Sequence, residues 1–103
     1  MAKRVLVETP DLLFRSKLAA AVTAAGGEVT RDAGACDLAV LELGPVDARD
    51  RIRAFVARGI PVVAYGSHVR ADVLHAARQA GATAVPNSRV EQTLSELVRG
   101  KTA

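Results

Sequence analysis

Short apolar segments alternate with stretches of helical pattern along the whole chain. The apolar segments predict five strands, at Arg4–Glu8, Glu28–Arg31, Asp37–Glu42, Ile60–Tyr65 and Ala82–Val85. Apart from the short second segment, they consist mostly of Val, Leu, Ile and Ala, without the regular alternation of a half-exposed strand. Such runs are typical of strands that are buried on both faces of a parallel sheet.

Four helices are predicted in the remaining chain. The first, Leu12–Ala25, follows the N-cap residue Asp11 and ends at Gly26-Gly27. Two further helices span Asp47–Arg58 and Arg70–Ala80, and a glycine follows each of them. The last helix is expected to be capped by Asn87 and Ser88 and to turn Val90, Leu94, Leu97 and Val98 to the core.

This alternation of strands and helices predicts an open α/β fold with a parallel sheet. Right-handed crossovers give the flavodoxin-like strand order 2-1-3-4-5. One helix is missing from the pattern, because only Asp32–Cys36 separates the second strand from the third. A crossover with a helix needs about 10–12 residues or more. We therefore expect a taut loop there, or a second strand that is short or displaced.

The composition fits one small domain over residues 1–103. The chain has 103 residues, half of them hydrophobic, and its only aromatic residues are Phe14, Phe55 and Tyr65, so the core must be aliphatic. The net charge of +3 and the pI of about 9.6 are mildly basic. There is no helix-turn-helix motif and no aromatic platform, and we expect no nucleic-acid partner.

The single cysteine, Cys36, excludes an internal disulfide and fits a reducing cytoplasm. The apolar run at the N-terminus is too short for a signal peptide, and no segment approaches the roughly 18 apolar residues of a membrane span. We therefore expect a cytoplasmic protein without a membrane partner. Cys36 and His75 are most simply a core packing residue and a surface or boundary residue.

Three segments resemble the receiver domains of response regulators, the CheY-like family. DLAVLELG, ending at Gly44, is similar to the family's DLVLLDL; IPVVAYGSH, ending at His68, is similar to IPVIALTAH; and GATAVPNS, ending at Ser88, is similar to GAxDYLxKP. With the strand pattern, the resemblance covers almost the full chain. It implies a receiver fold and a role in signal transduction.

The resemblance also implies which positions would carry receiver chemistry. The acidic pair that holds Mg²⁺ falls near Glu8 and Thr9, with Asp11 close by, so that one carboxylate of the pair is gone. The phosphoacceptor aspartate falls on Glu42, which has one extra methylene.

The remaining positions of the family's machinery are also altered. The hydroxyl residue after the fourth strand falls on Gly66, although Ser67 is next to it. The lysine after the fifth strand falls on Ser88, and the aromatic switch residue falls on Val85. Phosphoryl transfer needs a metal to neutralise charge and donors to bind the phosphoryl oxygens. The matched residues therefore predict a degenerate receiver, or pseudo-receiver, with no cofactor, no metal and no enzymatic activity.

The acidic residues allow more than one interpretation. Glu42 could act as a permanent mimic of aspartyl phosphate, because its carboxylate reaches farther than that of aspartate, or it could be an acid at the solvated end of a strand. Glu8, Asp11 and Glu42 could together hold one divalent cation. They could equally form a solvated acidic cluster.

A small-molecule or anion-binding module is the competing functional class. Gly66, Ser67, His68 and Arg70 follow a strand at the edge where open α/β sheets bind ligands, and a helix N-terminus attracts anions. Gly66 and Ser67 are also ordinary loop and cap residues. Glu8 and Glu42 would repel an anion there by about 1–4 kcal/mol each, depending on the effective dielectric.

The preferred functional hypothesis is a domain that binds another protein or a second copy of itself. In ordinary receivers the last helix–strand–helix unit makes such contacts, and here it corresponds to Arg70–Ala80, Ala82–Val85 and Arg89–Arg99. Arg78, Val85 and Arg89 mark this face. The sequence names neither the partner nor the pathway.

Overall fold

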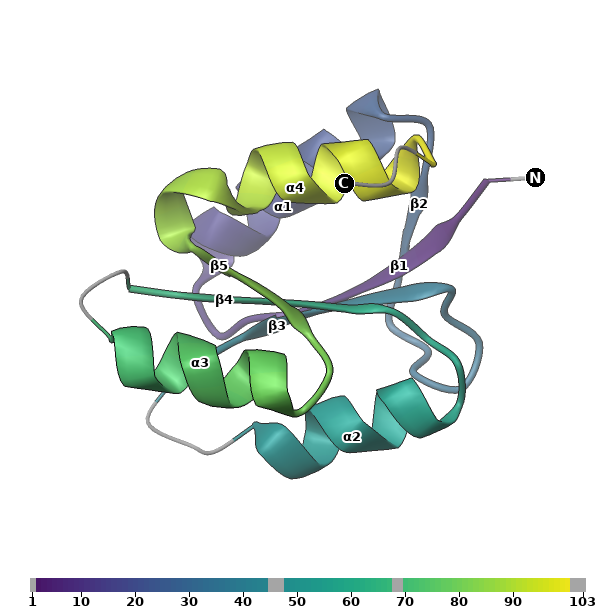
Figure 1. The fold of residues 1–103 in the computed structure, drawn as a ribbon. Coiled ribbons are helices and arrows are strands. Elements are labelled where there is room, and N and C mark those ends of the chain that lie inside the picture. Colours follow the sequence, from purple (N-terminus) through teal and green to yellow (C-terminus); the bar gives the residue numbers. More distant parts are fainter. Residues whose placement is uncertain (1, 45–47, 68–69, 101–103) are drawn as a thin grey trace.

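The computed structural model describes residues 2–44, 48–67 and 70–100. Five parallel strands form one sheet in the order β2-β1-β3-β4-β5 (Figure 1). The strands are β1 (Arg4–Glu8), β2 (Glu28–Thr30), β3 (Leu38–Glu42), β4 (Val62–Gly66) and β5 (Thr83–Pro86). The helices are α1 (Leu12–Ala24), α2 (Arg49–Ala57), α3 (Ala71–Gln79) and α4 (Val90–Val98). The strand order and fold predicted from the sequence are confirmed.

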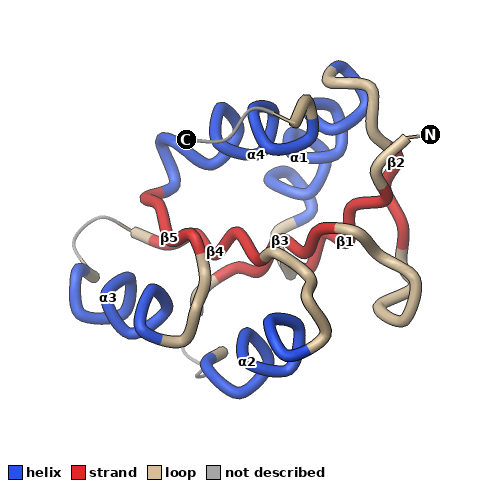
Figure 2. Tube along the Cα trace, turned by 45° about the vertical axis from the view of Figure 1, so that its right-hand side comes forward, coloured by secondary structure: helices blue, strands red, loops and turns tan. Residues whose placement is uncertain are grey.

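The helices form one layer on each face of the sheet. Figures 1 and 2 show α1 and α4 together on one face, and α2 and α3 on the other. Between each pair of helices and the sheet lies an aliphatic core. The α1/α4 side contains Val5, Val7, Leu18, Val22, Leu38, Val40, Val63, Tyr65, Val90 and Leu94. The α2/α3 side contains, among others, Leu6, Ala39, Leu41, Ile52, Phe55, Val62, Ala64, Leu74 and Ala77.

The central strands supply both cores because successive side chains of a strand point to opposite faces. In β3, residues Leu38 to Leu41 are all buried, and every residue of β4 is buried. This double burial explains why these segments are continuous apolar runs in the sequence. It also fixes which face each residue at the end of a strand occupies.

A structured loop replaces the helix that is missing between β2 and β3. The backbone N–H of Asp32 donates to Thr30 Oγ1 at 3.1 Å, and that of Gly34 donates to Asp32 Oδ1 at 2.9 Å. Arg58, at the end of α2, donates to the carbonyl of Ala33 at 2.9 Å. Cys36 is 6% exposed and packs in the core on the α2/α3 side. The loop therefore makes the connection from β2 to β3 without a helix and packs on the α2/α3 side.

Several predicted boundaries differ from the structure. β2 ends at Thr30, and Gly66 is the last residue of β4 rather than a loop residue. Asp47, the predicted start of a helix, and His68, a predicted loop residue, lie outside the described residues.

The two predicted N-caps have different outcomes. Asp11 caps α1 as expected, since its Oδ1 accepts from the N–H of Phe14 at 3.1 Å. The predicted cap at Asn87 and Ser88 is wrong. Residues Asn87–Arg89 form a 3₁₀ turn, which makes Arg89 the N-cap position of α4, without a capping side chain. None of the described helices is both long and apolar enough to cross a bilayer.

Candidate functional site

The candidate site lies where the carboxyl ends of β1, β3 and β4 meet. The chain runs from β1 to β2 on one side and places β3 on the other, so that the strand order reverses between β1 and β3. Open α/β sheets bind ligands beyond the carboxyl ends of their strands at such a switch point. Glu8 and Glu42 are the last residues of β1 and β3.

Two hydroxyl groups hold the carboxylate of Glu42. The Tyr65 hydroxyl donates to Glu42 Oε1 at 3.0 Å, and the Thr9 hydroxyl donates to the same oxygen. Thr9 is only 8% exposed, and its Oγ1 also accepts from the N–H of Asp11 at 3.2 Å. Glu42 and Tyr65 are register partners in β3 and β4. This cluster of Glu42, Tyr65 and Thr9 therefore links the end of β3, β4 and the connection between β1 and α1.

Tyr65 is the member of this cluster that the sequence analysis did not recognise as a site residue. It is 1% exposed, and its ring stacks on that of Phe14 in α1, with centroids 4.9 Å apart. Burial raises the pKa of the Tyr65 hydroxyl above its usual value of 10.0, the hydroxyl of Thr9 partly offsets this, and the bond to Glu42 adds to it. The signal in the sequence was a tyrosine in a fully buried strand, because a buried tyrosine hydroxyl usually has a partner.

Glu8 occupies the opposite face of the sheet. Val7 belongs to the α1/α4 core, so Glu8, the next residue, points toward α2. There the Arg51 guanidinium binds it in a bidentate arrangement, with Nε donating to Oε1 at 2.8 Å and a terminal nitrogen donating to Oε2. Glu42 lies on the α1/α4 face with Tyr65. The structure therefore separates the two acidic residues that the sequence analysis grouped.

Of the other residues predicted at this edge of the sheet, the structure brings only some together with Glu42. A cleft of about 120 Å³ is lined by Asp11, Phe14, Glu42, Leu43, Tyr65, Gly66, Ser67 and Asn87. Ser88 is exposed in the 3₁₀ turn and does not line this cleft. The cleft thus brings Gly66 and Ser67 beside two carboxylates, which opposes the binding of an anion there.

The residues at the magnesium position of a receiver do not fit a divalent cation. Glu8 is neutralised by Arg51, and the neighbouring Thr9 offers a hydroxyl that is already donated to Glu42. The Asp11 carboxylate caps α1. Among the described residues, no three His, Cys, Asp or Glu side chains are placed to share a metal ion.

The three residues of the predicted interaction face lie on neighbouring elements. Arg78 of α3 donates to the carbonyl of Ala84 in β5 at 2.8 Å, so it has a structural role in linking these elements. Val85 is half-buried and packs against the α1/α4 core, and Arg89 is exposed. The surface therefore contains two exposed arginines, one of them tethered to β5, around a partly buried valine.

The buried cluster predicts how Tyr65 titrates. Because the pKa of Tyr65 is raised in the folded state, its neutral hydroxyl contributes stability that is fully present below about pH 10. This contribution to the free energy of unfolding is lost as the pH rises through the higher pKa of the folded protein. Tyr65 is the only tyrosine and the chain has no tryptophan, so tyrosinate absorbance reports this residue alone.

We expect tyrosinate to form in the folded protein only well above pH 10, and near pH 10 in urea. A Tyr65→Phe variant, as control, should lack the titration. A midpoint near pH 10 in the folded protein, with the fold intact by circular dichroism, would contradict the buried hydrogen bond.

Comparison by sequence found no match, either among protein-family models or among curated proteins. Comparison by structure found many similar chains. A candidate response regulator from Chloroflexus aurantiacus is 15% identical, with a TM-score of 0.78 over 98% of this chain and 100% of that one.

Two further structures are similar over nearly their full lengths. A response regulator receiver protein from Burkholderia phymatum is 18% identical, with a TM-score of 0.73 over 98% of both chains. A CheY-like protein, TadZ, from Pseudomonas aeruginosa is also 18% identical, with a TM-score of 0.73 over 95% of this chain and 98% of that one. This chain therefore has the CheY-like fold of response-regulator receiver domains.

Proposed function

We propose that this chain is a degenerate receiver domain that is not phosphorylated and that acts in signalling by binding a protein. The observation that carries the proposal is the fixed position of Glu42. It occupies the place of the phosphoacceptor in the receiver resemblance, and its Oε1 accepts from both Thr9 and Tyr65. A carboxylate held by two hydroxyl donors is positioned as a structural group rather than exposed as a nucleophile.

The surroundings of Glu42 support the same conclusion. A transferred phosphoryl group carries charge that needs a metal ion or cationic donors. Glu8, which corresponds to a metal ligand, forms its ion pair with Arg51 on the other face of the sheet. Ser88 stands in place of the lysine, and a side chain at Gly66 would be only 3.3 Å from Leu43 Cβ. The chain therefore has no substitute for the family's phosphoryl ligands at the matched positions.

In this proposal Glu42 also gives the domain a permanent signalling state. In this proposal its carboxylate takes the place of the phosphoryl group, because it accepts hydrogen bonds from hydroxyls of β4 and of the β1–α1 connection. The domain then has one conformation that a partner recognises without a chemical switch. Its buried cysteine is compatible with the reducing cytoplasm that we assign to it.

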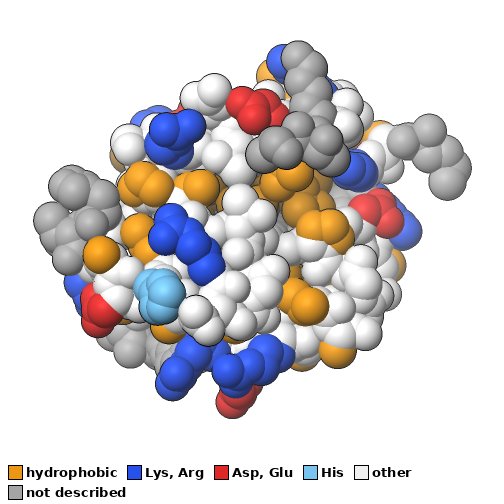
Figure 3. Space-filling view, viewed as in Figure 1, with side chains coloured by type: hydrophobic (Ala, Val, Ile, Leu, Met, Phe, Trp, Pro, Cys, Tyr) orange, Lys and Arg blue, Asp and Glu red, His pale blue; other side chains and the backbone are white. Residues whose placement is uncertain are grey.

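The proposed contact surface is the face built from α3, β5 and α4. Figure 3 views the molecule from the side of these elements: cationic and hydrophobic side chains are mixed across it, while acidic side chains lie toward the edges. Interfaces commonly combine apolar area with arginine. The charge of this face favours a partner, or a second copy, that presents acidic side chains around an apolar centre.

Phosphorylation is the first test. We expect no added phosphoryl group after incubation with acetyl phosphate and Mg²⁺, because the acid partner, hydroxyl and lysine are all replaced. Intact-mass spectrometry measures this directly, with an active receiver as positive control. Glu42→Asp should also remain unmodified, since the nucleophile is not the only part that is lost. An added phosphoryl group that disappears in Glu42→Ala would overturn the proposal.

Charge reversal tests the contact surface. Arg89→Glu should weaken self-association or recovery of a protein partner by about tenfold, since a rim charge of the wrong sign opposes an acidic partner. Arg78 is not a suitable target because it ties α3 to β5. Arg53→Glu is the matched control, an exposed arginine on α2 outside the face built from α3, β5 and α4. Sedimentation and partner recovery that are the same for both variants and the native chain would contradict this surface.

A further inference from the structure

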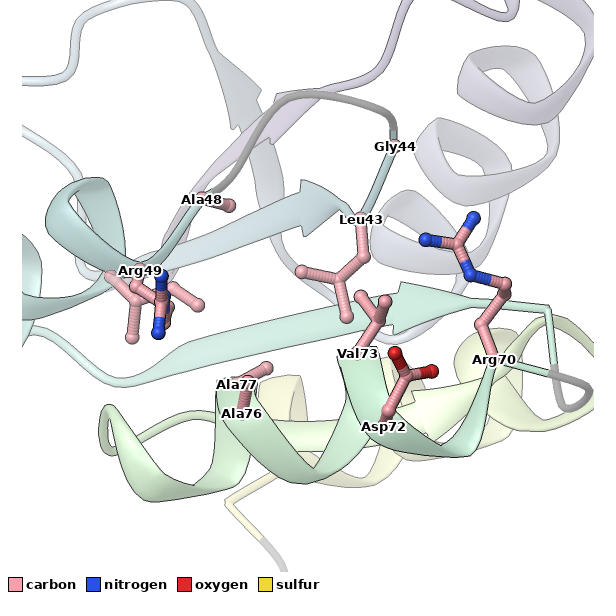
Figure 4. Close-up of a pocket in the computed structure, with 10 residues that line it drawn as sticks. Leu43, Gly44, Ala48, Arg49, Arg70, Asp72, Val73, Ala76 and Ala77 are labelled. Carbon is pink, nitrogen blue, oxygen red and sulfur yellow. The ribbon is translucent and has the colours of Figure 1, made fainter.

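A second cavity lies between α2 and α3, on the face of the sheet opposite the Glu42 cluster. Its volume is about 250 Å³, and Figure 4 shows the residues around it. Three alanines, Ala48, Ala76 and Ala77, leave the space open where larger side chains would fill it. The cavity uses none of the residues assigned to receiver chemistry.

The interior of this cavity is apolar. Ile52, which lines the cavity, is fully buried, and Ala77 is 1% exposed. Leu43, after β3, and Val73, in the first turns of α3, point toward each other in Figure 4. A flat hydrocarbon group would bury its surface against these four side chains, and such burial is the main source of affinity in small pockets.

Charged side chains stand at the rim of the cavity. Those among the described lining residues are Arg49, Arg70 and Asp72. Arg49 is the first residue of α2 and Arg70 is the N-cap of α3, so the N-termini of both helices face the cavity. The N-cap residues Ala48 and Arg70 make no capping hydrogen bond through their side chains. The N-terminus of α3 therefore adds to the positive potential of the Arg70 guanidinium.

We propose that this cavity binds a small organic carboxylate with a flat apolar body. The body lies against Leu43, Ile52 and Val73, and the carboxylate faces Arg70. Asp72 favours a ligand with a single negative charge, since its carboxylate would repel a dianion such as phosphate more strongly than a monoanion. One carboxylate at the rim is also too few for a metal ion. The proposal is independent of the proposed signalling function, because no residue of the Glu42 cluster takes part.

The size of the cavity restricts the ligand. Ligand pockets usually measure about 300–1,000 Å³, and this cavity lies just below that range. A ligand of roughly ten to fifteen non-hydrogen atoms fits, for which a Kd on the order of 0.1–1 mM is expected. We choose 2-naphthoate as the probe, with the neutral 2-naphthylmethanol as the comparison compound.

The test is an NMR titration of the isotope-labelled protein. With 2-naphthoate, saturable shifts should concentrate on the amides of Ile52, Val73, Ala76 and Ala77. The neutral compound should bind about tenfold more weakly, and added salt should weaken binding of the carboxylate.

Charge variants separate this site from adventitious binding. Arg70→Gln should weaken 2-naphthoate binding several-fold, and Asp72→Asn should strengthen it about twofold to threefold. The matched control is Arg53→Gln, which removes the same charge from α2 outside the cavity and should leave the affinity unchanged. Ala76→Leu should fill the cavity and abolish binding, and the NMR spectrum shows whether that variant still folds.

Three results would each overturn the proposal: no saturable shift at millimolar 2-naphthoate, equal affinity for the neutral compound, or equal losses in Arg70→Gln and Arg53→Gln. None of them bears on the phosphorylation of Glu42. Failure of this inference is therefore distinguishable from failure of the proposed function.

Discussion

The arrangement of the site depends on one constraint: the carboxylate of Glu42, at the carboxyl end of the central strand β3, needs hydrogen-bond partners. Glu42 lies beside a fully buried strand and on the face covered by α1. A partly buried charge without hydrogen-bond partners would cost several kcal/mol. The hydroxyls of Tyr65 and Thr9 meet this need, and stacking on Phe14 holds the tyrosine ring in place. A carboxylate that accepts two hydrogen bonds in this way is poorly suited to act as a nucleophile.

The alternation of side chains along the strands determines the rest of the rim. Because neighbouring residues point to opposite faces, Glu8 meets Arg51 of α2, whereas Thr9 meets Glu42. Two acids that are close in the sheet therefore have separate partners on its two sides. The same geometry leaves the α2/α3 face with its own cavity and its own pair of arginines. The two faces of this sheet therefore carry separate polar contacts and separate surfaces.

Much of the fold could be predicted from the sequence because it follows from local patterns. The apolar runs identified the strands, and the shortness of Asp32–Cys36 excluded a helix before β3. The N-cap at Asp11 was also evident from local sequence. Asn87 and Ser88 were misleading, since cap residues followed by an apolar stripe also suit the 3₁₀ turn that the structure shows.

The partners of the site residues could not be predicted in the same way. Glu8 and Arg51 are 43 residues apart, and their pairing depends on how α2 lies across the sheet. Tyr65 appeared to be one more core residue in an apolar strand, because its hydroxyl finds Glu42 only through the register of β3 with β4. The cavity between α2 and α3 depends on small residues of two helices, which no single segment reveals.

The most direct test of the central claim is a double-mutant cycle between Glu42 and Tyr65. The free energy of unfolding would be measured in urea for the native chain, Glu42→Ala, Tyr65→Phe and the double variant. If the hydrogen bond from Tyr65 to Glu42 holds β3 and β4 together at this edge, the losses of stability in the two single variants should not add. The coupling energy should be about 1–2 kcal/mol. Losses that add to within about 0.3 kcal/mol would show that Glu42 is an independent surface acid and would contradict the account.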